Sequence, residues 1–83
     1  MFRAWIATDM DFELCIASLV ALVERPILPN GLSRQIDTAV DPYLARFSGD
    51  KTTERLRIAV ALGDSATGAP KAHVEAVQHY LRR

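Results

Sequence analysis

The stretch that most limits how this chain can fold is LCIASLVALV at residues 14–23, in which Ser18 has the sole polar side chain. Glu13 and Glu24 bracket the run. The run is too short to cross a bilayer, which needs about 20 apolar residues. A helix that is apolar around most of its circumference must be covered on more than one side. The run therefore predicts a central helix in a small fold.

On a helical wheel this segment has two separate apolar faces. The larger face is the predicted core face and carries Phe12, Ile16, Leu19 and Val23, flanked by Cys15 and Leu22. The second face lies more than about 90° away. Its residues are Met10, Leu14, Ala17 and Ala21. Polar residues separate the two faces, so the second face must be closed either by the rest of the chain or by another protein.

The ends of this helix are expected from capping signals. Thr8 and Asp11 resemble a capping box, which predicts a helix start near Thr8 or Asp9. The helix should end by Arg25, because a proline follows. Residues 1–8 would then form a short strand or an ordered arm. The segment PILPNG, which comes next, predicts a turn.

Two further helices are predicted from apolar spacing. In segment 33–48 the helical period is followed by Ile36, Ala39, Val40, Tyr43, Leu44 and Phe47. Pro42 interrupts this pattern without shifting it, which predicts one kinked helix, and Gly49 is the expected stop. The last helix should begin near Pro70. Its apolar stripe is Val74, Val77 and Leu81.

Residues 52–63 fit two structures. Leu56, Ile58, Val60 and Leu62 alternate with arginine and alanine, which is the strand period. Thr53 with Glu54, and the many good helix formers, favour a helix instead. A helix gives a mainly α fold, a small bundle of three to four helices around a central two-faced helix. A strand gives an α+β fold with short strands at 2–7 and 55–62. We favour the helix.

Composition narrows the class of protein. The 83 residues predict a single globular domain, 1–83. The formal net charge is zero, whereas chains that neutralise many phosphates carry a basic excess. The lone Cys15 predicts a buried thiol in a reducing compartment. Acidic residues precede the apolar run, unlike a signal peptide, so we expect a cytoplasmic protein without membrane contact. An excess of arginine over lysine indicates a bacterial or phage source.

The segment GDSATGAPK at 63–71 is similar to a phosphate-binding loop in its two glycines and its lysine. Such a loop requires lysine and then serine or threonine directly after the second glycine. Ala69 and Pro70 stand there instead, and a proline has no N–H to offer an anion. A connection between two helices explains the segment more simply.

The histidine pair and the aspartate pair predict neither a metal site nor a catalytic site. His73 and His79 are six residues apart on one expected helix, so they do not converge on a metal ion. Asp37 and Asp41 share a polar helix face with Arg34, as a solvated surface would. We therefore predict no catalytic residue, no metal and no cofactor.

Most positive charge in the second half of the chain belongs to Arg55, Arg57, Lys71, Arg82 and Arg83. If these side chains converge, they could contact RNA or DNA. The aromatic residues are not interleaved with them, as a stacking platform for bases would require. Binding of nucleic acid is therefore an alternative rather than the main prediction.

The sequence thus predicts a non-enzymatic protein–protein interaction module of the size of a small bacterial or phage regulator or inhibitor. It would form a homodimer, or bind a partner protein, through Met10, Leu14, Ala17 and Ala21. One alternative is a nucleic-acid-associated regulator that uses the basic residues above. The other is a protein that binds a small molecule or phosphate at loop 63–71.

Overall fold

The computed structural model describes residues 2–25 and 31–82, with side chains for 10–25 and 31–82. Four helices make up this part of the chain: α1 (Phe2–Val23), α2 (Leu32–Arg46), α3 (Lys51–Ser65) and α4 (Lys71–Leu81). The mainly α prediction is confirmed. The α+β alternative is wrong, because segments 2–7 and 55–62 both lie inside helices and no strand occurs among the described residues.

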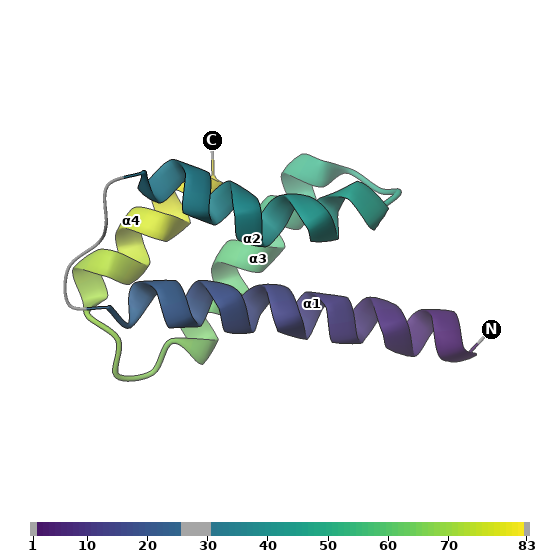
Figure 1. Ribbon diagram of the computed structural model, residues 1–83, viewed down its shortest axis with the longest axis horizontal. Coiled ribbons are helices and arrows are strands. Elements are labelled where there is room, and N and C mark those ends of the chain that lie inside the picture. Colours follow the sequence, from purple (N-terminus) through teal and green to yellow (C-terminus); the bar gives the residue numbers. More distant parts are fainter. Residues whose placement is uncertain (1, 26–30, 83) are drawn as a thin grey trace.

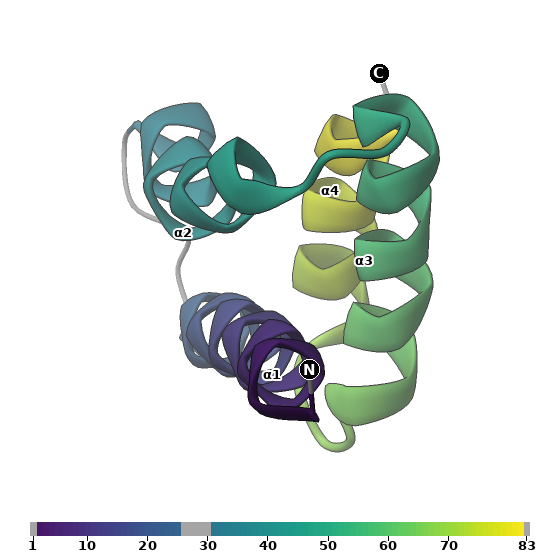
Figure 2. The ribbon, with the colours of Figure 1, turned by 90° about the vertical axis from the view of Figure 1, so that its right-hand side faces the viewer.

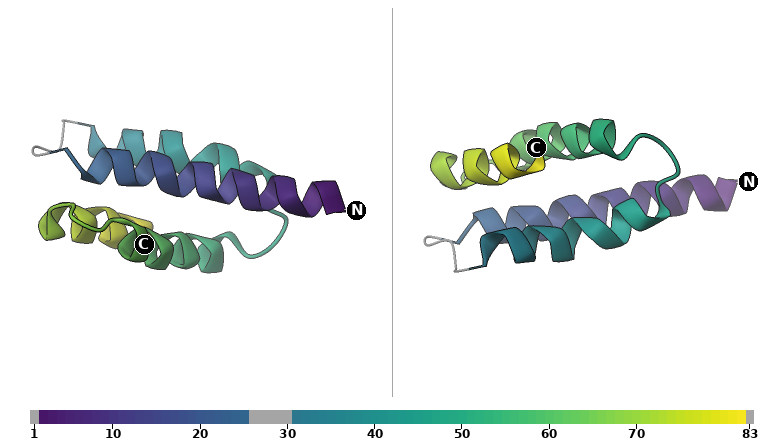
Figure 3. Two further views of the ribbon diagram at one scale, coloured as in Figure 1. Left: turned by 90° about the horizontal axis from the view of Figure 1, so that it is seen from below. Right: turned by 90° about the horizontal axis from the view of Figure 1, so that it is seen from above.

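The helices form two antiparallel pairs, α1 with α2 and α3 with α4 (Figure 1). Figure 3 shows these pairs as two layers, with the N-terminal end of α1 extending past the other helices. Helix α1 packs against all three of the others, but it is not enclosed by them as a central helix would be. Figure 2, seen nearly along α1, places it at one corner of the arrangement, with α2 and α3 on two sides.

The N-terminal boundary predicted for the first helix is wrong. Helix α1 begins at Phe2, so Thr8 lies within the helix and does not cap it. Residues 2–7 contain neither proline nor glycine, and extending an existing helix avoids the cost of nucleation. The predicted end is confirmed, because α1 stops at Val23. Of the predicted turn only Gly31 lies within the described residues, and its φ of 80° fits a turn glycine.

Local contacts set the other boundaries. Helix α2 contains Pro42, as the unbroken apolar phase predicts, but it ends at Arg46 rather than Ser48. The next residue is extended, with φ −83° and ψ 124°. The cap of α3 is Asp50, not Thr53: its carboxylate accepts hydrogen bonds from the Thr53 hydroxyl (2.8 Å) and the Thr52 N–H (3.0 Å). These two bonds, that of Thr53 being the stronger, lower the pKa of Asp50.

The connection expected within segment 63–71 is shorter than that segment. Helix α3 continues to Ser65, so the connection comprises residues 66–70. Pro70 stands at the capping position of α4 rather than in its first turn. Its carbonyl oxygen accepts hydrogen bonds from the N–H groups of His73 (3.1 Å) and Val74 (3.2 Å). Pro70 therefore starts α4 through its carbonyl group, and the helix begins at Lys71, one residue after the predicted position.

The core lies between the two layers and contains the predicted core face of α1. Among the described side chains of α1, from Met10 onward, the buried ones are Cys15, Ile16, Leu19, Leu22 and Val23, and Phe12 is partly buried. Helix α3 explains the strand-like alternation of residues 55–62. Ile58 and Leu62 are buried, whereas Leu56 and Val60 are exposed on the opposite side of the helix. Apolar residues on two faces of one helix thus produced a period close to two.

Candidate functional site

The second apolar face of α1 points away from the core. We call it the outer face of α1, and its residues are Met10, Leu14, Ala17 and Ala21. All of these side chains are exposed, with Met10 at 56 % and Leu14 at 65 % of their full accessibility. On the helical wheel they lie nearly opposite Leu19, which is fully buried. The described residues of the chain therefore leave this face open to solvent.

Open grooves flank the outer face on both sides. The groove toward α3 has a volume of about 460 Å³ and is lined mainly by apolar groups, including Ile16, Val20 and Ala61. The groove toward α2, of about 320 Å³, includes Cys15 and Pro42 in its lining. A partner lying along α1 could therefore contact apolar surface beyond the outer face itself.

Polar groups border the outer face, and those on the α2 side bond within the chain. On the α2 side, Arg46 donates a hydrogen bond to the carboxylate of Asp11 at 2.8 Å. Ser18 donates its hydroxyl proton to the Leu14 carbonyl oxygen at 3.0 Å. Glu13 is exposed on the α3 side. An apolar centre with a polar border is the usual anatomy of a protein–protein interface.

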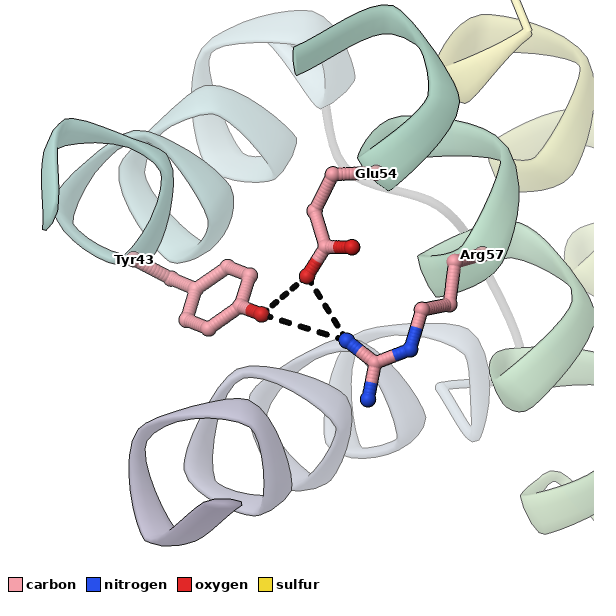
Figure 4. Close-up of polar contacts among 3 residues, drawn as sticks. All are labelled: Tyr43, Glu54 and Arg57. Atoms are coloured by element: carbon pink, nitrogen blue, oxygen red, sulfur yellow. Dashed lines mark hydrogen bonds and ion pairs between the residues drawn. The ribbon is translucent and has the colours of Figure 1, made fainter. Parts of the chain in front are cut away.

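A second feature is a polar cluster of Tyr43, Glu54 and Arg57 around a buried carboxylate (Figure 4). Glu54 belongs to the core side of α3 and is buried. Its carboxylate accepts a hydrogen bond from the Tyr43 hydroxyl. The same oxygen accepts another from Arg57 Nη1 at 2.7 Å, and Arg57 also lies within 3.3 Å of the Tyr43 hydroxyl oxygen. The buried carboxylate is thus paired, as a buried charge must be.

The pKa values in this region show groups that are held protonated. Burial, followed by the hydrogen bond to the Glu54 carboxylate, raises the pKa of Tyr43 to about 12. Burial, followed by the Glu54 charge, raises the pKa of the Cys15 thiol to about 11. A nucleophile or general base at neutral pH needs the opposite shift for such groups. The cluster therefore holds the Tyr43 phenol in its neutral form and connects α2 with α3.

The sequence pattern does not identify this cluster. It places Tyr43 in an apolar core stripe and Arg57 on a candidate nucleic-acid surface. The available signal is Glu54, which shares the α3 face of Ile58 and Leu62 and so brings a charge into the core. Such a carboxylate requires a donor from a neighbouring helix.

The basic residues of the nucleic-acid alternative do not form one patch. Arg55 lies 3.6 Å from the Asp41 carboxylate, and Lys71 lies 3.8 Å from that of Glu75. Arg57 pairs with Glu54. Because α3 and α4 are antiparallel, Lys71 lies at the far end of the pair from Arg55 (Figure 2). Arg82 is exposed, and Arg83 lies outside the described residues.

Segment 63–71 is not arranged as a phosphate site. Residues 63–65 belong to α3, which changes the loop geometry that the motif requires. The Ala69 N–H donates to the Ala66 carbonyl oxygen at 3.3 Å and is thus used within the turn. Gly68 adopts φ 87°, which closes this turn. The simpler interpretation, a connection between helices, fits these contacts.

The two aspartates have separate structural partners. Asp37 accepts a hydrogen bond from the Tyr80 hydroxyl at 2.6 Å, which links α2 to α4, whereas Asp41 faces Arg55. Both line an open groove of about 410 Å³ together with these partners. His79 is exposed, while His73 has a buried Nδ1 without a hydrogen-bond partner among the described residues. In that same part of the chain, no three potential ligands cluster to hold a metal ion.

Comparisons with known proteins add no assignment. No family model, no curated protein and no solved structure matches the chain. Within the described residues, no helix is both long enough and apolar enough to cross a membrane. A functional proposal therefore depends on the geometry of the outer face of α1 and on the contacts that occupy the polar groups elsewhere.

Proposed function

We propose that this protein is a non-enzymatic interaction module that binds protein through the outer face of α1. The observation that carries the proposal is the exposure of Leu14 at the centre of that face, beside Met10. Scattered exposed apolar residues are normal, but large ones adjacent on one helix face, within a polar border, mark contact surfaces. Burying a leucine contributes roughly 1.5–3 kcal/mol, so covering this face would favour association.

The other interpretations have less support. The polar side chains best placed for chemistry, Tyr43 and Glu54, bind each other and Arg57. Most described basic residues of the nucleic-acid alternative already face carboxylates. A single domain of zero net charge fits a small cytoplasmic regulator or inhibitor, of bacterial or phage type, that acts by protein contact.

Photo-crosslinking tests the proposal whichever protein the partner is. A benzophenone side chain is placed at Ala21, on the outer face, or at Val60, an exposed apolar position on α3. Each protein is irradiated both in pure form and in a cell lysate. We expect protein crosslinks from position 21, whether to a second copy or to another protein, and few from position 60.

The substitution Leu14→Glu should abolish the crosslinks from position 21, because it places a charge in the apolar contact. Val60→Glu is the matched control, since Val60 is 58 % exposed and Leu14 65 %. Both variants are checked for native helix content by circular dichroism. Equal crosslinking from positions 21 and 60, or crosslinking that survives Leu14→Glu, would contradict the proposal.

A further inference from the structure

We infer that the partner covering the outer face of α1 is a second copy of this chain, with its α1 antiparallel to the first. This inference rests on the proposed function and names its partner. It starts from a size gradient along the face. The two large side chains, Met10 and Leu14, come first along the helix, and the two small ones, Ala17 and Ala21, follow.

The spacing of these residues is that of a helix–helix seam. Met10, Leu14, Ala17 and Ala21 are separated by four, three and four residues. This is the alternation of the two core positions in a heptad, which keeps one narrow face directed at a partner helix. A second helix can therefore lie along the whole outer face rather than cross it at one point.

The size gradient fits its own antiparallel copy. When Leu14 of one copy lies opposite Ala17 of the other, Met10 lies opposite Ala21, and two-fold symmetry repeats both contacts. Every layer of the seam then combines one large and one small side chain, so the helices stay equally spaced. Parallel pairing would place leucine on leucine and alanine on alanine, which leaves a gap at the alanines.

The charges beside the seam favour the same orientation. In a parallel pair, Glu13 of one copy would lie beside Asp11 of the other, which brings carboxylates of both chains together at one end. In the antiparallel pair the same sides of the two α1 helices meet, so Glu13 lies near Val20 of the second copy, and Asp11 near Ser18. Neither of these neighbours is charged. The chain's zero net charge also gives two copies little overall repulsion.

The fold leaves room for this pairing. Helix α1 stands at a corner of the arrangement, and its side away from α2 and α3 is not covered by either helix (Figure 2). The exposure of Met10 and Leu14 shows that no described side chain fills that side. A helix of a second copy can therefore approach α1 without displacing the first copy's own helices.

Disulfide trapping tests the orientation. In a Cys15→Ala background, one protein carries Met10→Cys and another carries Ala21→Cys. Antiparallel pairing brings position 10 of one copy next to position 21 of the other. Two copies of position 10 would then be offset by about 16 Å along the helices, as would two copies of position 21. A disulfide requires Cα atoms within about 7 Å.

Crosslinked dimers are therefore expected from the mixture of the two proteins, and at least tenfold fewer from either alone. A Val60→Cys protein in the same background controls for random collisions. Light scattering over a concentration series should show the wild-type mass approaching twice the 9.2 kDa of one chain. The Leu14→Glu variant should stay at the monomer mass with native circular dichroism.

The possible results separate this inference from the proposed function. Efficient crosslinking of Met10→Cys to itself would show parallel pairing and overturn the inference, while the outer face remains the contact. A wild-type monomer at all concentrations also overturns the inference, and lysate crosslinking from position 21 then decides the proposed function. A dimer that survives Leu14→Glu overturns both.

Discussion

The guanidinium carbon of Arg57 lies 3.8 Å from the centre of the Phe12 ring, so a cation on α3 covers an aromatic side chain of α1. Phe12 in turn packs edge-on against Tyr43 of α2, with 5.7 Å between ring centres. The same guanidinium pairs with the buried carboxylate of Glu54. A cation–π contact, an edge-on aromatic contact and an ion pair therefore join α1, α2 and α3 at one place, on the core side of the helix that carries the outer face.

Removing the Arg57 charge should destabilise the fold. Arg57→Met keeps the apolar stem but leaves the Glu54 carboxylate buried without its cation, which costs about 3–5 kcal/mol in fully buried pairs. Because the Arg57 side chain is half exposed, we expect a loss of about 2 kcal/mol in the free energy of unfolding, measured in urea. Arg55→Met is the control and should cost under about 0.5 kcal/mol, since its partner Asp41 is exposed. Equal losses would contradict this account.

Stability at high pH should depend on Tyr43. Its pKa is about 12 in the folded chain and 10.0 for an unperturbed tyrosine, so the phenol binds its proton more tightly when the chain is folded. The stabilisation is fully present below pH 10 and is lost as the pH rises from 10 to 12. Ultraviolet titration should show a phenolate step near pH 12 that Tyr43→Phe removes. Tyr80 is the other tyrosine of the chain and is present in both proteins, so the comparison is the loss of one phenolate's absorbance near pH 12, and no loss there would contradict the assignment.

The thiol of Cys15 should react slowly. A pKa of about 11 in place of 9.0 lowers the thiolate fraction at pH 8 by about 100-fold, and burial of the side chain restricts access further. We expect the native protein to react with iodoacetamide at least about 100-fold more slowly than the protein in denaturant. Fast labelling of the native chain, at the rate of an exposed cysteine, would show that the groove between α1 and α2 opens.

The sequence predicts those parts of the fold that depend on apolar period. The core face of α1 is buried as expected, because burying large side chains such as Leu19 dominates packing. The start of α1 differs from the prediction because Thr8 and Asp11 fit a capping pattern that an already formed helix overrides. The partner of Glu54 could not be found in sequence either, since Tyr43 lies on another helix and its approach depends on how α2 and α3 pack.

The candidate site, like the fold, could be predicted from the sequence only in part. Helical geometry alone places Leu14 opposite the core, but whether another helix covers it depends on tertiary packing. Val60 shows the converse, because its alternation with Arg55 and Arg57 suggests a strand, whereas α3 places it on an outward face. Periodicity thus predicts faces, and only the packed chain shows which of them stay open.

A last prediction concerns how closely α4 approaches α3. Gln78 of α4 donates a hydrogen bond from Nε2 to the Ala59 carbonyl oxygen at 2.9 Å. A Cβ atom at Gly63 would lie 2.6 Å from that nitrogen, so Gly63→Ala must displace the amide. Alanine favours the helix over glycine by about 0.8 kcal/mol, and the displaced hydrogen bond contributes about 1 kcal/mol. The two effects nearly cancel, and Gly63→Ala alone should change the free energy of unfolding by less than about 0.5 kcal/mol.

A double-mutant cycle separates the two effects. In a Gln78→Ala background there is no amide to displace, so Gly63→Ala should raise the free energy of unfolding by about 0.5–0.8 kcal/mol, the helix preference alone. The measurement is urea unfolding of all four proteins, with Ala72→Gly, at an exposed position of α4, as a check on the helix preference itself. The same effect of Gly63→Ala in both backgrounds would mean that Gln78 swings aside freely. The glycine would then not be required for the close packing of α4 on α3.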